Sequence, residues 1–102
     1  MINAIIKNNL EKISSLCKHH KVKELYAFGS VTREDFKENS DVDFLVDFDN
    51  MPVLEYADNY FDLADELENI LHRKIDLVTQ KSLRNPVFIR VINRTRIPVY
   101  TA

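Results

Sequence analysis

Three aspartates of this chain stand at positions where they could share metal ions. Asp41 and Asp43 are separated by one residue, and Asp76 stands in the otherwise apolar run 75–78. On a strand, Asp41 and Asp43 would project from the same face, about 7 Å apart at ~3.3–3.4 Å per residue. Two like charges at this spacing repel each other unless a cation bridges them or water separates them. Mg²⁺ prefers one or two carboxylates together with substrate phosphates, so the pattern indicates a magnesium site.

Each of these acids also has a plainer interpretation. A solvated strand face would account for Asp41 and Asp43, and Asp47 and Asp49 continue the same alternation, so spacing alone does not select the pair. An outward-facing position on an edge strand would account for Asp76. Strand interiors are nevertheless poor places for aspartate, so Asp76 calls for a reason.

The only glycine, Gly29, follows an apolar strand and is followed by Ser30. A residue without a Cβ lets backbone N–H groups approach an anion closely. A helix starting beyond Ser30 would add a favourable dipole, so this segment could hold phosphate oxygens with its amides and the Ser30 hydroxyl. Alternatively, Gly29 is a turn glycine and Ser30 a helix cap. A phosphate cradle beside three carboxylates is the equipment of nucleotidyl transfer.

The elements that would position these residues alternate between helix and strand. Hydrophobic spacing predicts helices from Ile2 to Cys17, ending near His19 and His20, at 31–36, at 53–71 with Asn50 and Pro52 at its start, and from Asn85-Pro86 to about Asn93. It also predicts strands at 25–28, 41–48, 74–78 and 97–101. Pro98 in the last of these strands indicates a sheet edge. We therefore expect an α+β fold, a small mixed sheet with flanking helices, in a single domain over residues 1–102. Spacing does not decide which strands pair parallel.

Two of these elements have a clear pattern of faces. The strand at 41–48 alternates, with one core face (Val42, Phe44, Val46, Phe48) and one acidic face. The long helix is expected to pack through a stripe of apolar residues: Val53, Leu54, Ala57, Tyr60, Phe61, Ala64, Leu67, Ile70 and Leu71.

Composition narrows the possible functions. The chain has 102 residues, 45% of them hydrophobic, which is enough for one ordinary core. Cys17 is the only cysteine, so neither an internal disulfide nor a cysteine metal cluster can form, and the three histidines are too scattered for a zinc site. With no signal peptide and no long apolar run, we expect a cytoplasmic protein without membrane contact. Residues 73–102 carry seven Lys or Arg against one Asp, but without interleaved exposed aromatics nucleic-acid binding is not expected.

The motifs resemble a known family. The segment FGSVTR at 28–33 is followed, after seven residues, by DVDFLV at 41–46. This resembles the minimal nucleotidyltransferase (MNT) family of the DNA polymerase β-like superfamily, whose pattern is Gly-Ser, an Arg three residues beyond the Ser, Ser-Asp-x-Asp on the next strand and a third Asp further on. The likeness covers nearly the whole chain and implies the polymerase β-like fold. One position departs from it, because Glu34 stands where the family commonly has glycine after the Arg, which puts the local loop geometry in doubt.

The resemblance implies a role for each matching residue. Gly29 and Ser30 would hold the β- and γ-phosphates of ATP, and Arg33 would lie near the phosphates or orient the loop. Asp41 and Asp43 would bind two Mg²⁺ ions. Asp76 would hold one of these ions and help to deprotonate the attacking hydroxyl.

The resemblance also implies a partner. MNT proteins are typically encoded beside a small helical HEPN toxin and act as its antitoxin, in some members as protein adenylyltransferases that transfer AMP to a tyrosine of the toxin. Two other functions stay open: a non-catalytic module that neutralises its partner by binding it, and a metal-dependent nuclease, which would not need the Gly-Ser cradle. A homo-oligomer also stays open.

Overall fold

The computed structural model describes residues 3–33, 36–37 and 39–102 of the chain. Its elements, in order, are α1 (Ala4–Lys7), α2 (Leu10–His19), β1 (Val22–Phe28), the 3₁₀ turn η1 (Gly29–Thr32), β2 (Val42–Phe48), α3 (Val53–Leu71), β3 (Ile75–Thr79), the 3₁₀ turn η2 (Gln80–Ser82), α4 (Pro86–Thr95) and β4 (Ile97–Thr101). Within these ranges, no helix combines the length and the apolar character needed to cross a membrane.

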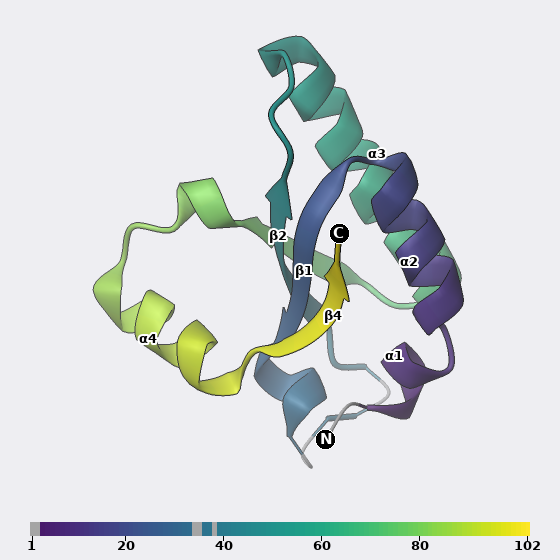
Figure 1. The fold of residues 1–102 in the computed structure, drawn as a ribbon. Coiled ribbons are helices and arrows are strands. Elements are labelled where there is room, and N and C mark those ends of the chain that lie inside the picture. Colours follow the sequence, from purple (N-terminus) through teal and green to yellow (C-terminus); the bar gives the residue numbers. More distant parts are fainter. Residues whose placement is uncertain (1–2, 34–35, 38) are drawn as a thin grey trace.

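The four strands form one sheet in the order β3-β2-β1-β4. β1 pairs antiparallel with both β2 and β4, whereas β2 and β3 run parallel and are joined by the α3 crossover. Helices cover both sides, with α2 and α3 on one side of the sheet and α4 on the other (Figure 1). The expected mixed sheet with flanking helices is confirmed. Pro98 lies on the edge strand β4, as predicted, and pairs with Tyr26 of β1 next to a register shift.

The first helix was predicted as one piece and is in fact broken. α1 ends at Lys7 and α2 starts at Leu10. Asn9 between them has φ −118° and ψ 12°, and its side-chain amide donates to the carbonyl of Ile5 at 2.7 Å. Asparagine side chains compete with the helical backbone for hydrogen bonds, which explains a break inside a continuous apolar periodicity. Ile2, the expected start, lies outside the described residues.

The main core lies between the sheet and the pair α2 and α3. The predicted core face of β2 is fully buried there, against residues such as Leu63 and Leu67 of α3. The predicted stripe of α3 is wrong at its start, since Val53 and Leu54 are both 84% exposed, and Phe61 is 64% exposed. The first turns of α3 extend beyond the end of the sheet, so they have no strand to pack on (Figure 1). The helix begins at Val53, with Pro52 rather than Asn50 at the N-cap position.

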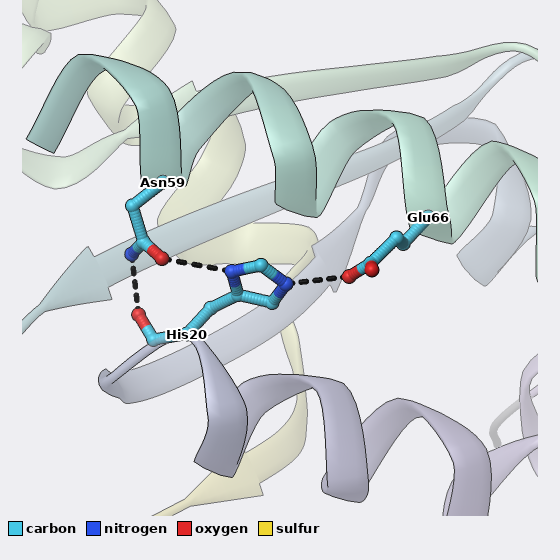
Figure 2. A network of polar contacts seen from close by, with 3 residues as sticks. All are labelled: His20, Asn59 and Glu66. Carbon is cyan, nitrogen blue, oxygen red and sulfur yellow. Dashed lines mark hydrogen bonds and ion pairs between the residues drawn. The ribbon is translucent and has the colours of Figure 1, made fainter. Parts of the chain in front are cut away.

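A buried histidine ties the end of α2 to α3. His20, only 5% exposed, places its ring between two side chains of α3 (Figure 2). Its Nδ1 lies 2.8 Å from the Asn59 side-chain oxygen, and its Nε2 lies 2.5 Å from a Glu66 carboxylate oxygen. The Asn59 amide nitrogen donates to the His20 carbonyl at 2.5 Å, which fixes the amide so that its oxygen faces the ring. Both ring nitrogens therefore face acceptors, and the residue has a structural role.

The second face of the sheet is covered in part by α4. Ile92 of α4 packs on Phe28 and Leu45 in a small cluster, and all three are buried. Asn85 caps this helix as predicted, accepting from the backbone N–H of Val87 at 2.9 Å. The face of β2 expected to be acidic is therefore mixed, because Leu45 is buried between the half-exposed Asp43 and Asp47.

Candidate active site

Asp43 and Asp76 lie directly beside each other on neighbouring strands. They are register partners in the parallel ladder of β2 and β3, so both side chains leave the same face of the sheet. This is the face opposite the main core, because the flanking residues Val42 and Leu77 are buried in that core. Asp41, the predicted first residue of this strand, is exposed and lies just before β2, which begins one residue later at Val42. The Val42 N–H donates to the carbonyl of Lys74 at 3.0 Å.

The pKa of Asp43 reflects its burial and the neighbouring acids. Its pKa is raised to about 6, first by burial and then by the negative charges of Asp76 and Asp41. Arg33 acts in the opposite direction and lowers the pKa of Asp43. The part of this rise in pKa that comes from the charges of Asp76 and Asp41 is only partly offset by Arg33. A cation placed here would offset the remainder.

Gly29 packs against the Asp43 carboxylate. A Cβ built on Gly29 would lie 2.5 Å from Oδ2 of Asp43, and the residue has φ +73°, a conformation that side chains disfavour. Glycine is therefore required at this position for two reasons: its positive φ angle and the close approach of the turn to the Asp43 carboxylate. The predicted helix at 31–36 is wrong in position: the chain makes a single 3₁₀ turn from Gly29 to Thr32, and Glu34 and Asp35 lie outside the described residues. One such turn provides little of the dipole expected beyond Ser30.

Two threonines form hydrogen bonds with the backbone of Gly29, and neither was singled out from the sequence. Thr32 Oγ1 donates to the Gly29 carbonyl at 2.6 Å. The Gly29 N–H donates to Thr95 Oγ1 at 3.3 Å, while the Thr95 hydroxyl donates in turn to the Val91 carbonyl at 3.0 Å. The end of α4 is thereby linked to the turn. The Gly29 amide therefore has a partner inside the fold, and a role for it in binding phosphate stays a prediction.

Ser30 and Arg33 both lie close to the carboxylates. The Ser30 hydroxyl lies 3.5 Å from the backbone carbonyl of Asp41, so the turn lies against the entry to β2. Arg33 is exposed and follows the turn in an extended conformation, close enough to lower the pKa of Asp43. The structure thus brings together all six residues singled out from the sequence: Gly29, Ser30, Arg33, Asp41, Asp43 and Asp76.

A hollow opens at the β3 edge, near Asp76. It has a volume of about 450 Å³ and is lined by residues of α3, β3 and η2, among them Tyr56, Tyr60 and Leu77. The Tyr60 hydroxyl donates to the Leu77 carbonyl, and the pKa of Tyr60 is raised by burial and by the charge of Asp76. Leu77 points to the core side of the sheet, so this hollow borders the carboxylate face without forming part of it.

The carboxylates are neighbours but do not form a closed metal cage. Across the described ranges, no group of three or more His, Cys, Asp or Glu side chains is arranged to hold a metal ion as it stands. The donor set is made only of oxygens, which is the chemistry that Mg²⁺ selects, and Mg²⁺ commonly completes its shell with substrate phosphates and water. The residues therefore fit a magnesium site that a substrate completes.

Comparison with known proteins defines the family. The profile of the family described as "Polymerase beta, Nucleotidyltransferase" matches residues 11–102, and the chain belongs to this family. It is 38% identical over 95 residues to a candidate protein adenylyltransferase of Methanocaldococcus jannaschii, covering 92% of this chain and 94% of that protein. It is also 38% identical over 86 residues to the protein adenylyltransferase MntA of Thermococcus cleftensis, covering 76% and 84% of the two chains.

Solved structures show the same fold. A candidate minimal nucleotidyltransferase superposes with a TM-score of 0.77 at 31% identity, covering 96% of both chains. A toxin–antitoxin structure with AMP-PNP superposes with a TM-score of 0.71 at 25% identity, covering 92% of this chain and 74% of that one. An MNT antitoxin in complex with a tri-AMPylated HEPN toxin of Shewanella oneidensis, at 22% identity and a TM-score of 0.65, has the same fold. The expected polymerase β-like fold and the resemblance to minimal nucleotidyltransferases are both confirmed.

Proposed function

We propose that this chain transfers AMP from ATP to a hydroxyl of a partner protein, a tyrosine of a HEPN toxin, and thereby acts as the antitoxin. The observation that carries the proposal is the pairing of Asp43 with Asp76 on one face, beside the Gly29 turn. The protein adenylyltransferase named among its relatives supports the reaction, and the HEPN complex among structures of the same fold supports the partner. We propose further that residues 1–102 act as one domain in the cytoplasm.

In this proposal Asp41, Asp43 and Asp76 hold two Mg²⁺ ions together with the triphosphate. When bound, these ions offset charge on the α-phosphate and on the departing pyrophosphate, and they acidify the attacking hydroxyl. Ser30 and Arg33 bind and orient the β- and γ-phosphates.

The proton and the bonds can be followed through the step. The acceptor oxygen forms a bond to the α-phosphorus, the bond from that phosphorus to the pyrophosphate oxygen breaks, and the hydroxyl proton passes to Asp76. Asp76 is exposed and is therefore accessible to an incoming acceptor. The AMP remains on the acceptor as a phosphodiester, and pyrophosphate leaves.

The test is co-expression with the HEPN-family protein of the neighbouring gene, followed by intact mass measurement of that protein. The wild type and Asp47→Asn should add mass in multiples of one adenylate, whereas Asp43→Asn should add none. Asp47 is a matched control, because it is a half-exposed acid on the same strand and the same face.

Two other results would favour the alternative functions. If the wild type forms no adduct and the Asp43→Asn variant still neutralises the toxin in cells, the chain is a non-catalytic binding module. Release of nucleic-acid fragments without a nucleoside triphosphate would favour the nuclease.

A further inference from the structure

One side of α4 combines exposed apolar and cationic side chains. Val87, Arg90, Val91 and Arg94 are spaced by three and four residues, so they form one stripe on the helix, here called the α4 stripe. All four are exposed, Val87 to 66% and Val91 to 43%. Of the ten residues of α4, Ile92 alone is buried, on the side that packs on the sheet. The stripe therefore faces away from the core that holds the helix.

The charge of the stripe is not balanced within the chain. Among the residues that the structure describes, neither Arg90 nor Arg94 lies within ion-pair distance of an acid. The segment 77–102 contains five Lys or Arg and no Asp or Glu. An apolar pair flanked by unpaired guanidinium groups suits a protein surface whose carboxylates surround an apolar centre, because arginine pairs with carboxylate in a planar, bidentate way.

The stripe is also continuous with the candidate active site. Thr95, one residue beyond Arg94, accepts the hydrogen bond from the Gly29 N–H. Through Phe28 and Leu45, α4 is packed on the same face of the sheet that carries Asp43 and Asp76. A protein bound along the stripe would therefore lie beside the place where an acceptor hydroxyl has to arrive.

We propose that the α4 stripe docks the acceptor protein through a surface of acidic residues around an apolar contact. The identity of that protein rests on the proposed function, but the surface itself is defined by Val87, Arg90, Val91 and Arg94. Because α4 is exposed and is linked to the turn at Gly29, it can supply recognition of the acceptor next to the site.

Two other occupants fit the stripe less well. Single-stranded RNA stacks on several exposed aromatic faces. α4 offers only one aromatic, Phe88, which is 39% exposed and packs against Phe28 with ring centroids 6.0 Å apart. A second copy of this chain could offer the acidic side of α3, which carries Asp58, Asp62 and Asp65. Because α3 and α4 cover opposite sides of the sheet (Figure 1), a two-fold pair that made this contact twice would have to bring both sides of each copy against the other. A single α3–α4 contact is instead heterologous and forms a ring or an open filament.

The experiment measures binding of the HEPN-family protein of the neighbouring gene, without ATP, to four forms of this chain. These are the wild type, Arg90→Glu/Arg94→Glu, Val87→Gln/Val91→Gln, and the control Lys7→Glu/Lys12→Glu, whose exposed lysines lie on α1 and α2. The control has the same charge change as the arginine variant. Circular dichroism melts verify that each variant is folded. We expect each α4 variant to weaken binding by about tenfold or more, and the control to leave it unchanged.

Several results would overturn the proposal: no binding by the wild type, α4 variants that bind as tightly as the wild type, or a control that loses as much affinity as they do. Binding of a poly(U) oligonucleotide that depends on the stripe, with partner binding intact, would assign the surface to nucleic acid. Wild-type self-association that the α4 variants abolish, again with partner binding intact, would assign it to a second copy. Stripe-dependent binding without AMP transfer would count against the proposed reaction alone.

Discussion

Gly29 and Asp43 are in direct contact, such that one additional carbon on Gly29 would lie 2.5 Å from Oδ2 of Asp43. The turn after β1 and the central acid of β2 are therefore positioned by each other. A Cβ added at Gly29 would force either the Asp43 carboxylate or the turn to move. The candidate phosphate site and the candidate metal site are coupled through this contact.

Gly29→Ala should lower both stability and activity. The left-handed backbone at φ +73° costs an alanine roughly 1–2 kcal/mol, and the Asp43 side chain has to move in addition. For a domain of this size each kcal/mol corresponds to a melting temperature about 4–8 °C lower. AMP transfer should fall by at least about tenfold, since a small misplacement of catalytic groups is costly. Ser30→Ala is the control for stability: it keeps the backbone of the turn and should melt close to the wild type. Equal melting of Gly29→Ala and the wild type would contradict the contact.

Asp43→Asn should stabilise the metal-free protein at neutral pH and abolish transfer. Because the pKa of Asp43 is raised to about 6 by burial, Asp76 and Asp41, the folded state binds this proton more tightly than the unfolded state does. The contribution of the Asp43 carboxyl to the free energy of unfolding of the wild type is therefore present at pH 4, and it is lost as the pH rises through about 6. Allowing for solvent screening of a half-exposed group, asparagine should gain about 1 kcal/mol at pH 7.5 and almost nothing at pH 4. Thermal melts at both pH values measure this. Asp47→Asn is the control for the change of charge on this face, and a gain of the same size in it would contradict a cause specific to the position of Asp43.

Thr95 should act as a positioning residue for the turn. Thr95→Val keeps the shape but removes the acceptor of the Gly29 N–H, whereas Thr95→Ser keeps it. One such hydrogen bond is worth roughly 0.5–1.5 kcal/mol, and at 3.3 Å the lower part of that range applies. AMP-PNP with Mg²⁺ should therefore bind Thr95→Val about twofold to fivefold more weakly, by calorimetry, with recovery in Thr95→Ser. Equal weakening in both variants would indicate a packing effect instead.

Asn59→Ala should destabilise the protein without affecting transfer. The substitution leaves the His20 carbonyl and the buried ring nitrogen Nδ1 without their partners. Leaving buried polar groups unpaired costs about 1–3 kcal/mol, to be measured by urea unfolding. Asp58→Ala, an exposed change one residue away on α3, should stay within about 0.5 kcal/mol of the wild type. Loss of transfer in folded Asn59→Ala would show that the network also serves the site.

Much of the architecture could be predicted from hydrophobic spacing. The alternation in β2 predicted its core face, and helical spacing predicted α3 and α4 to within one or two residues. The break at Asn9 could not be predicted in this way, because the apolar period continues through it while a side-chain hydrogen bond interrupts the backbone. The exposure of Val53 and Leu54 depends on where the sheet ends, which a helical period does not contain.

The candidate site divides in the same way. Residue types and spacing indicated Asp41, Asp43 and Asp76 but did not separate the first two from Asp47 and Asp49, which the resemblance to minimal nucleotidyltransferases did. The exact pairing of Asp43 with Asp76 depends on the parallel register, which no local pattern specifies. Thr95 could not be selected at all, since it stands 66 residues from Gly29 and is an ordinary threonine at a helix end. The raised pKa of Asp43 likewise follows from burial and from neighbours brought close by folding.

The register of β2 and β3 also bears on how the protein acquires its activity. Asp76 flanks Asp43 only after the chain has passed through the whole of α3 and returned to the sheet. A slip of one residue would turn Asp76 into the apolar core and bring Ile75 and Leu77 to the surface, so the misaligned form is strongly disfavoured. During synthesis, a chain that has not yet added this strand carries only part of the acidic set. In the proposed reaction, a chain in which β3 is not yet paired with β2 therefore lacks one of its three acids and should not transfer AMP.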